Sequence, residues 1–239
     1  MITYFTFAGK NSQDFKVYIS GQGTYNAPAR VYTTYKVPGR SGDLFVDEQR
    51  YENIDVTYPA FIFEDMRNNL EGFRNFLLSQ KGYQRLEDTY HPDEYRMAVY
   101  KDGLEVGIDP RHEFSSFEIT FNCKPQRFLK SGDQIVTFTS DGSIYNPTAF
   151  ESKPIIRVYG EGQLGIGSDT ITITPYSGGP SRHIDIDCEL MDCRYGTINF
   201  NANVLMTGYD FPTLKPGTTN FSLGNGISKL EITPRWWRL

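Results

Sequence analysis

Apolar and polar side chains alternate along several stretches of the N-terminal half of the chain. Residues 15–19 read FKVYI, and in residues 117–121 apolar side chains again occupy every second position. A two-residue period places successive side chains on opposite faces of an extended chain, so each run predicts a β-strand with one buried face. A further strand region is expected over residues 52–63, interrupted by Pro59.

The period changes once, where four apolar side chains recur at intervals of four, three and four residues. They are Met66, Leu70, Phe73 and Leu77. This spacing predicts one face of an α-helix packed on a sheet. Acidic Glu64 and Asp65 suit the positive end of its dipole, and Lys81-Gly82 is expected to end it, with glycine as a left-handed cap.

Two later segments complete the expectations for the first half. Lys101-Asp102-Gly103 predicts a hairpin turn that leads into a strand over residues 104–106. Residues 124–133 combine turn residues and charges, and they are interpreted as an exposed, protease-sensitive connection between two domains. The predicted division is an α+β domain over residues 1–130 and a second domain over residues 131–239.

The second half has no helical period. Short β-like runs recur from about residue 135 to residue 233, with turn signals between them such as Asn146-Pro147 and Asn225-Gly226. Regular short strands separated by turns are typical of a β-sandwich or jelly roll. The sequence therefore predicts a mainly β protein with one helix.

Composition agrees with that fold class. Aromatic residues make up 15% of the 239 residues, and there are 22 glycines and 13 prolines, which favour pleated surfaces and frequent turns. The net charge of −5 argues against a broad nucleic-acid surface, which needs clustered Lys and Arg. The three cysteines and the absence of a signal-like start predict reduced thiols, and no run is long enough for insertion into a membrane.

The stretch Val37–Leu44, VPGRSGDL, lies between two β-like runs and carries the strongest turn chemistry in the chain. Proline presets one turn torsion, and the two glycines accept positive φ. Arg40 offers a planar fork of donors, for which Asp43 is the local candidate partner. On chemistry alone this is a hairpin loop.

The stretch also resembles the siphophage distal tail (Dit) protein family, the hub of phage tail tips. Similar segments occur in the same order along almost the whole chain. They are residues 7–15, 37–44, 51–63, 211–217 and 232–237. The resemblance implies a split-barrel-like N-terminal domain that forms a hexameric ring, followed by a galectin-like or jelly-roll sandwich.

The resemblance further implies a structural virion protein without catalysis, assembled in the host cytoplasm. The expected partners are other copies of the chain, the tail tube protein, the tail-associated (Tal) hub protein, and receptor-binding or other baseplate proteins. The residues expected to set the ring geometry are Pro38, Gly39, Arg40, Ser41, Gly42 and Asp43. No catalytic, metal or cofactor residue is predicted.

Gly160–Gly165 matches the dinucleotide-binding fingerprint letter by letter. That motif needs a helix after it to hold the pyrophosphate, and residues 166–174 instead read as a strand. The interpretation is a glycine-rich strand connection, and Gly162 is expected to matter for folding.

The remaining candidates for chemistry are weaker. Asp185, Asp187, Glu189 and Asp192 lie close in sequence to two cysteines, which raises the alternative of a calcium or zinc site. The three histidines, His91, His112 and His183, have no nucleophile at a known catalytic spacing. Trp236 and Trp237 are candidates for stacking on a sugar or on a partner protein. The structural alternative is that one side chain lies in the sandwich core and the other contacts a neighbour, because adjacent strand residues point to opposite faces. Two rival functions therefore stay open: a carbohydrate-binding module and a glycan hydrolase.

Overall fold

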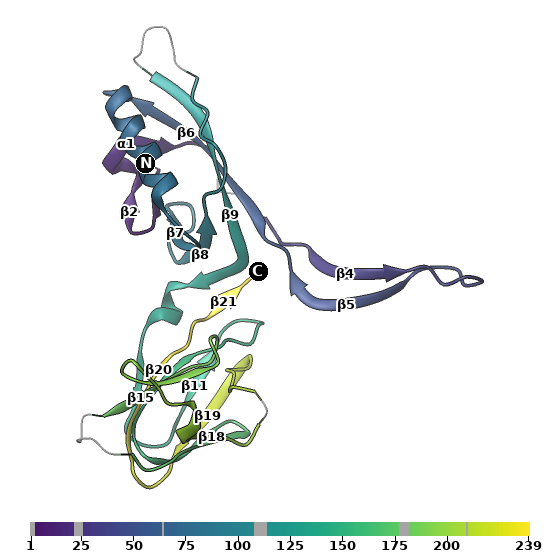
Figure 1. The fold of residues 1–239 in the computed structure, drawn as a ribbon, viewed down its shortest axis with the longest axis vertical. Helices are drawn as coiled ribbons and strands as arrows, with labels where there is room; N and C mark the ends of the chain where they lie inside the picture. The colour runs from purple at the N-terminus through teal and green to yellow at the C-terminus, as the bar shows by residue number, and fades with distance from the viewer. Residues whose placement is uncertain (1–2, 22–25, 64, 108–113, 177–181, 209) are drawn as a thin grey trace. The chain divides into compact units, whose positions relative to one another are not determined.

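The computed structural model describes residues 3–21, 26–63, 65–107, 114–176, 182–208 and 210–239. The chain divides into two compact units, Met1–Arg127 with Leu239 and Phe128–Arg238 (Figure 1). Strands dominate both units, and the described residues contain a single α-helix. The prediction of a mainly β protein with one helix is confirmed.

The first unit is built on an eight-stranded sheet in the order β2-β1-β7-β8-β9-β6-β3, with β21 (Trp237–Arg238) pairing to β9 off this path. Its other strands are β1 (Phe5–Phe7), β2 (Lys10–Asn11), β3 (Val17–Ile19), β6 (Ile54–Phe63), β7 (Gln84–Asp88), β8 (Glu94–Val99) and β9 (Phe114–Leu129). A 3-10 helix, η1 (Ser12–Phe15), joins β2 to β3, and helix α1 (Met66–Ser79) follows β6. A separate two-stranded sheet pairs β4 (Arg30–Tyr35) with β5 (Leu44–Tyr51).

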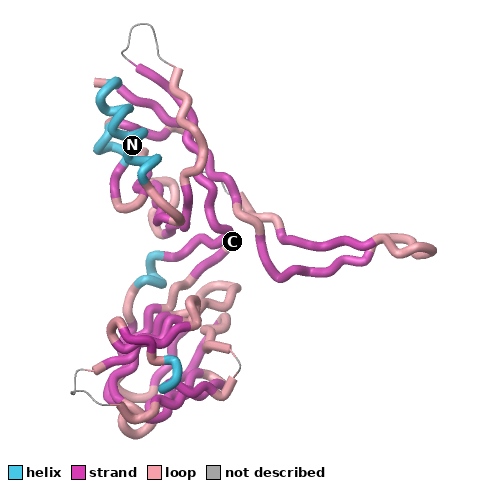
Figure 2. Tube along the Cα trace, in the orientation of Figure 1, coloured by secondary structure: helices cyan, strands magenta, loops and turns pink. Residues whose placement is uncertain are grey.

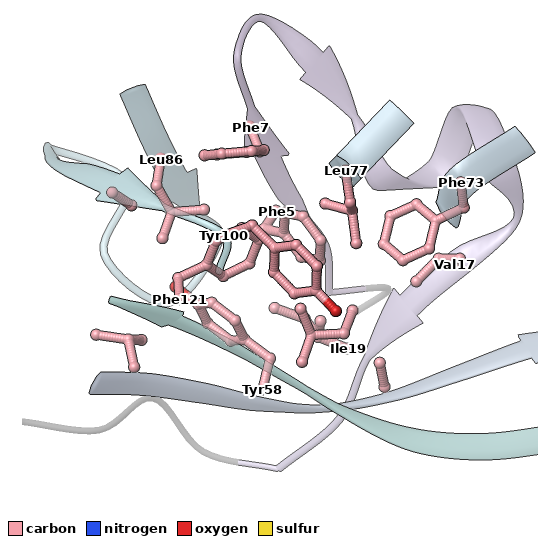
Figure 3. Packing of buried hydrophobic residues seen from close by; sticks show 14 of the residues in the cluster. Phe5, Phe7, Val17, Ile19, Tyr58, Phe73, Leu77, Leu86, Tyr100 and Phe121 are labelled. Carbon is pink, nitrogen blue, oxygen red and sulfur yellow. The ribbon is translucent and has the colours of Figure 1, made fainter. Parts of the chain in front are cut away.

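The core of the first unit is rich in aromatic side chains. Phe5 lies 5.4 Å from Phe121 and 5.6 Å from Tyr58, measured between ring centroids. Figure 3 shows Phe73 and Leu77, which are fully buried, on the same side of the cluster as Val17. Alternation along β6 and β9 supplies this core, because every second side chain of each strand points into it.

Helix α1 has the expected apolar face but ends earlier than expected. It stops at Ser79, three residues before Gly82, whose φ is +67°. The Ser79 hydroxyl and the Gln80 amide both donate to the Phe76 carbonyl, at 2.8 and 3.2 Å. Because side chains satisfy the last turn, the glycine is not the cap. At the other end, Asp65 accepts from the Asn68 amide and caps no backbone N–H.

The predicted hairpin at Lys101-Asp102-Gly103 is wrong. Residues 100–107 are irregular, and no strand occupies residues 104–106. Leu104 and Val106 instead pack against the aromatic core as part of an irregular segment. Burial of these two side chains therefore replaces the hydrogen-bond ladder that the turn signal suggested.

Residues 124–133 are not the exposed loop that the sequence suggested. They form the end of β9 and a 3-10 turn, η2 (Lys130–Asp133). The Leu129 N–H donates to the Trp236 carbonyl at 2.8 Å, and the Arg235 N–H donates to the Gly132 carbonyl at 2.8 Å. A Cβ on Gly132 would lie 2.3 Å from the Trp236 nitrogen, so this glycine permits close backbone contact.

The second unit is a β-sandwich of a six-stranded and a five-stranded sheet. The first has the order β10 (Val136–Phe138), β20 (Ile227–Thr233), β12 (Ile155–Gly160), β15 (His183–Asp187), β16 (Asp192–Tyr195), β17 (Ile198–Asn199). The second has the order β11 (Gly142–Asn146), β19 (Gly217–Leu223), β13 (Gly162–Ile166), β14 (Asp169–Ile173), β18 (Val204–Met206); a 3-10 turn, η3 (Asn201–Asn203), precedes β18. Buried side chains from both sheets form one core.

Candidate functional site: an exposed β-hairpin

Strands β4 and β5 form a hairpin that we call the arm, residues 30–51. Among the described residues these two strands pair only with each other (Figure 2). Seven of the eight side chains of β5 are exposed, whereas β6, which begins three residues later, alternates between buried and exposed. Strand β5 therefore lacks the alternation of a strand whose sheet has one buried face.

Both faces of the arm carry large apolar side chains. Tyr32, opposite Asp47, and Phe45, opposite Thr34, share one face, where their rings meet edge to face at 6.2 Å. Phe45 is 65% exposed. The other face carries Tyr35 opposite Leu44, and Val46 next along β5. All five of these apolar side chains are exposed.

The base of the arm is braced by polar contacts. Arg30 donates to both carboxylate oxygens of Asp47, with Nε to Oδ1 at 3.0 Å, and its guanidinium lies 5.6 Å from the Tyr51 ring. This hydrogen bond lowers the pKa of Asp47 and raises that of Arg30. Gln49 has φ +56° beside the register shift between the two strands, and its N–H donates to Asp47. The bulge and the ion pair therefore lie together at the base of the arm, and a bulge increases the local twist of a strand pair.

The stretch predicted as the ring-geometry loop forms the tip of the arm. The Arg40 N–H donates to the Val37 carbonyl at 3.2 Å, which closes a turn with Pro38 and Gly39 at its centre. Gly39 has φ +81°, the value that a type II turn needs at this position. Ser41, Gly42 and Asp43 return the chain to β5, and all of these residues are exposed.

Two details of the tip differ from the sequence interpretation. Gly42 has φ +85°, but a Cβ added there would meet nothing within 4 Å. Within the described chain, glycine is therefore favoured by the backbone conformation and not by a close contact with another segment. Arg40 and Asp43 form no ion pair with each other or with another described residue. The side chain of Arg40 is therefore open to a partner.

The sequence did not single out the apolar side chains of β4 and β5. Tyr32 and Phe45 looked like ordinary strand residues, because a run of β-formers does not reveal whether its faces are covered. One signal was available: Leu44-Phe45-Val46 presents consecutive apolar residues, as in a strand covered on both faces. Since no second layer covers the arm among the described residues, its exposure is a tertiary property.

The glycine fingerprint joins two strands. Gly160 ends β12 and Gly162 begins β13, so a strand follows it in the structure. Gly160 has φ +109°, and a Cβ added to it would lie 2.0 Å from the Gly226 carbonyl oxygen. Gly162 has φ +123°, and a Cβ added to it would lie 2.5 Å from the Asn225 carbonyl oxygen. The glycines are there for close backbone approach, as the interpretation as a strand connection requires.

The aspartates of the acidic cluster, Asp185, Asp187 and Asp192, bind arginine side chains, and Asp187 also accepts from backbone N–H groups. Asp185 binds Arg157 through two hydrogen bonds, and Asp187 binds Arg235 in the same bidentate way at 2.8 and 2.9 Å. Asp192 accepts from Arg194. Within the described ranges, no group of three or more His, Cys, Asp or Glu side chains is placed to hold a metal ion.

The other candidates have structural partners. Trp236 is 5% exposed in the sandwich core. Trp237 stacks on Phe150 at 4.5 Å and donates to the Glu151 carbonyl. His91 lies 3.2 Å from Asp88, and His183 lies 3.8 Å from Asp185; His112 falls outside the described residues.

In the described chain, no helix is both long and apolar enough to cross a bilayer. No family model and no curated protein matches the sequence. Solved structures do match, and two of them, both of phage proteins, match over essentially the full length of both chains.

The fold is that of a phage distal tail protein. The chain is similar to the SPP1 Dit protein, a structure described as a paradigm of the hub adsorption apparatus in phages that infect Gram-positive bacteria. The TM-score is 0.74, the identity is 15%, and both chains are covered completely. It is also similar to a chain of the phage p2 baseplate in its activated conformation with Sr, with TM-score 0.54, 12% identity, and coverage of 100% and 99%. The resemblance expected from the sequence is confirmed at the level of the fold.

Proposed function

We propose that this chain is a structural hub protein of a phage tail tip, with no catalytic role. The observation that carries the proposal is the match of the entire chain to the SPP1 Dit fold, over both units. Within the described residues, the three aspartates of the acidic cluster each pair with an arginine, which agrees with a scaffold.

The hub is a ring of six copies formed by residues 1–130, with residues 131–239 as the attached sandwich. The support is the arm, whose two apolar faces are uncovered in the single chain. An isolated two-stranded ribbon is marginally stable in water, so an arm of this kind is stabilised by packing on another surface. A closed ring repeats one such contact at every subunit boundary.

In the virion the ring joins the tail tube protein on one side to the tail-associated (Tal) hub protein on the other. Receptor-binding or other baseplate proteins attach at its rim. The protein assembles in the host cytoplasm and stays at the tail tip. These partners follow from the resemblance to distal tail proteins, and each can be tested by co-purification with the candidate tail proteins of the same phage.

The direct test is the molar mass of the purified protein by light scattering and sedimentation, together with negative-stain images. The expected result is a mass six times that of the chain and ring-shaped particles. A protein that keeps the mass of one chain at every concentration, and shows no rings, contradicts the proposal.

Arg40 at the arm tip is expected to bond across the subunit boundary. Arg40→Ala would then weaken the ring while circular dichroism and the melting temperature of the monomer stay unchanged, because the side chain has no partner within the described chain. Arg74→Ala, an exposed arginine of helix α1, is the matched control. An unchanged ring would remove Arg40 from the interface, and a lost fold would assign it a structural role.

A further inference from the structure

The outer face of the eight-stranded sheet, opposite the aromatic core, carries an unexpected aromatic cluster. We call it the aromatic face, and it comprises Tyr18 of β3, Phe61 and Phe63 of β6, and Phe114 of β9. Phe61 sits opposite both Tyr18 and Ser116 in the strand register, and Phe63 sits opposite Phe114. The four side chains therefore occupy two adjacent rows of one surface.

These rings contact one another and leave the surface open. Tyr18 lies 5.1 Å from Phe63 and 5.7 Å from Phe61, and Phe61 lies 6.1 Å from Phe114. Phe114 is 48% exposed and the other three are half-buried. Elsewhere the same outer face is polar, with Thr57 bonded to Thr120 across the strands. The aromatic face is thus a local exception to the alternation of β6 and β9.

Two shallow hollows flank Phe61. One is lined by residues that include Pro59, Phe114 and Glu118, and the other by residues that include Tyr18 and Phe63. Hollows beside a partly exposed ring are the surface shape that receives protruding aromatic side chains of a partner. The arm carries such side chains, and nothing in the described part of its own chain buries them.

We propose that the aromatic face receives the arm of a second copy of this chain, with the Tyr32 and Phe45 face of the arm laid against Phe61 and Phe114. This inference rests on the proposed ring, and it assigns both halves of the subunit boundary. Arm and face are different surfaces, so the contact is heterologous. Each copy gives its arm to one neighbour and receives an arm from the other, which is how a ring closes.

Charge supports the same pairing. On the aromatic face, Glu118 is exposed and lies two residues along β9 from Ser116, the partner of Phe61. On the arm, Lys36 is exposed and lies two residues along the chain from Thr34, the partner of Phe45. Two residues of extended chain span about 7 Å on either surface. When Phe45 contacts Phe61, the ammonium of Lys36 can therefore reach the carboxylate of Glu118.

The first experiment removes one half of the contact at a time. Phe61→Thr with Phe114→Thr alters the face, and Tyr32→Thr with Phe45→Thr alters the arm; threonine keeps strand propensity. Each double variant is expected to lose the ring and sediment as a folded monomer, checked by circular dichroism. The control is Tyr145→Thr, because Tyr145 is 66% exposed in the second unit; it should leave the ring intact.

Mixing the two double variants tests the heterologous geometry. The arm-altered protein keeps a working face, and the face-altered protein keeps a working arm, so an equimolar mixture should form dimers of twice the monomer mass and no larger species. A mixture that stays monomeric overturns the proposed pairing. Restored full rings overturn it too, because each mixed pair has only one complete contact to offer.

The charge register is tested by reversal. Glu118→Lys and Lys36→Glu should each raise the concentration at which the ring dissociates by about fivefold or more, in the range of charge pairs at interfaces, and the double variant should recover most of the loss. If wild type forms rings that survive the changes on the aromatic face, the ring proposal stands and this pairing fails. If wild type never forms rings, both fail.

Discussion

Gly162 belongs to a sequence pattern of nucleotide-binding sites, but its role in this fold is structural. The nucleotide-binding fingerprint needs a helix directly after its glycines to bind the pyrophosphate, whereas Gly162 begins strand β13. Its value lies in φ +123° and in the Asn225 carbonyl, 2.5 Å from where a Cβ would be. The same holds for Gly160 against the carbonyl of Gly226. Both glycines let two backbone segments of the sandwich meet.

Gly162→Ala is expected to lower the free energy of unfolding by about 2 kcal/mol or more, from backbone strain plus the clash. Gly196→Ala is the matched control: Gly196 has φ +61° but open space around it, so the loss should be about 1 kcal/mol. Urea unfolding followed by circular dichroism measures both. Equal losses would show that the close approach to Asn225 adds nothing, and saturable binding of a dinucleotide would overturn the structural role.

The three cysteines are predicted to be inert in the folded protein. Burial raises the pKa of Cys123, Cys188 and Cys193 to about 12. At pH 8 about one thiol in ten thousand is then ionised, and the thiolate is the reactive species. Ellman's reagent should react slowly with native protein and should titrate all three thiols at once in denaturant. Fast reaction of any thiol in native protein contradicts this assignment.

At the scale of elements, ion pairs between segments tie the sandwich together where the sequence suggested a metal site. Asp187, at the end of β15, holds Arg235 and also accepts from the backbone N–H groups of Glu189 and Leu190. Burial by itself would raise the pKa of Asp187, but the Arg235 hydrogen bond and these N–H donors outweigh it, and the pKa lies below its ordinary value. Arg235 in turn has φ +57°, stabilised by its N–H bond to Gly132.

A carboxylate with a depressed pKa in the folded state contributes stability above its unfolded pKa of about 4, and this contribution is lost as the pH falls toward the folded value. Asp187→Asn should therefore destabilise the protein by about 1–3 kcal/mol at pH 7, since Arg235 loses its partner. The difference from wild type should shrink below about pH 4. Thermal melts across pH 3 to 8 measure it.

The control for that experiment is Glu189→Gln, because the Lys153–Glu189 pair is more than half exposed on both sides. A surface pair of this kind contributes about 0–1 kcal/mol, so the variant should melt close to wild type at every pH. A pH-independent difference for Asp187→Asn would assign the loss to packing and remove the electrostatic argument.

At the scale of the whole molecule, the proposed ring predicts that assembly covers the arm. Its tip offers two trypsin sites, Lys36 and Arg40, both exposed in the single chain. A backbone that is exposed and held by one ladder opens easily to a protease. We expect cleavage at these two sites to be fast in the monomeric variant with Phe61→Thr and Phe114→Thr, and much slower in the assembled wild type.

Mass spectrometry of the first fragments checks this prediction. Cleavage at Arg194, which is exposed in the second unit and is followed by Tyr195, serves as the internal reference and should proceed at the same rate in both samples. Equal rates at Lys36 and Arg40 in ring and monomer would mean that the arm stays uncovered in the assembly. The exposed-loop interpretation of residues 124–133 predicted a different first cut, and the strand and 3-10 turn found there argue against it.

Much of this protein follows from the sequence by itself, because local periodicity needs no distant partner. The four-three-four spacing determined helix α1, alternation determined β3, β6 and β9, and turn chemistry determined the tip at Pro38-Gly39. Strands without such a signal were missed: β13 and β19 contain glycines, and their strand character comes from pairing with β14, with β11 and with each other. The resemblance to distal tail proteins was also legible in short segments.

Tertiary structure alone decided which surfaces are left uncovered. Alternation of β6 predicts one buried face, but only the folded sheet shows that Phe61, Phe63, Phe114 and Tyr18 come together on the opposite side from three separate strands. Residues 44–46 look like a core strand in sequence, and only the fold leaves them bare. Sequence pattern records a residue's preference for burial, whereas the partner that buries it is set by contacts between distant segments.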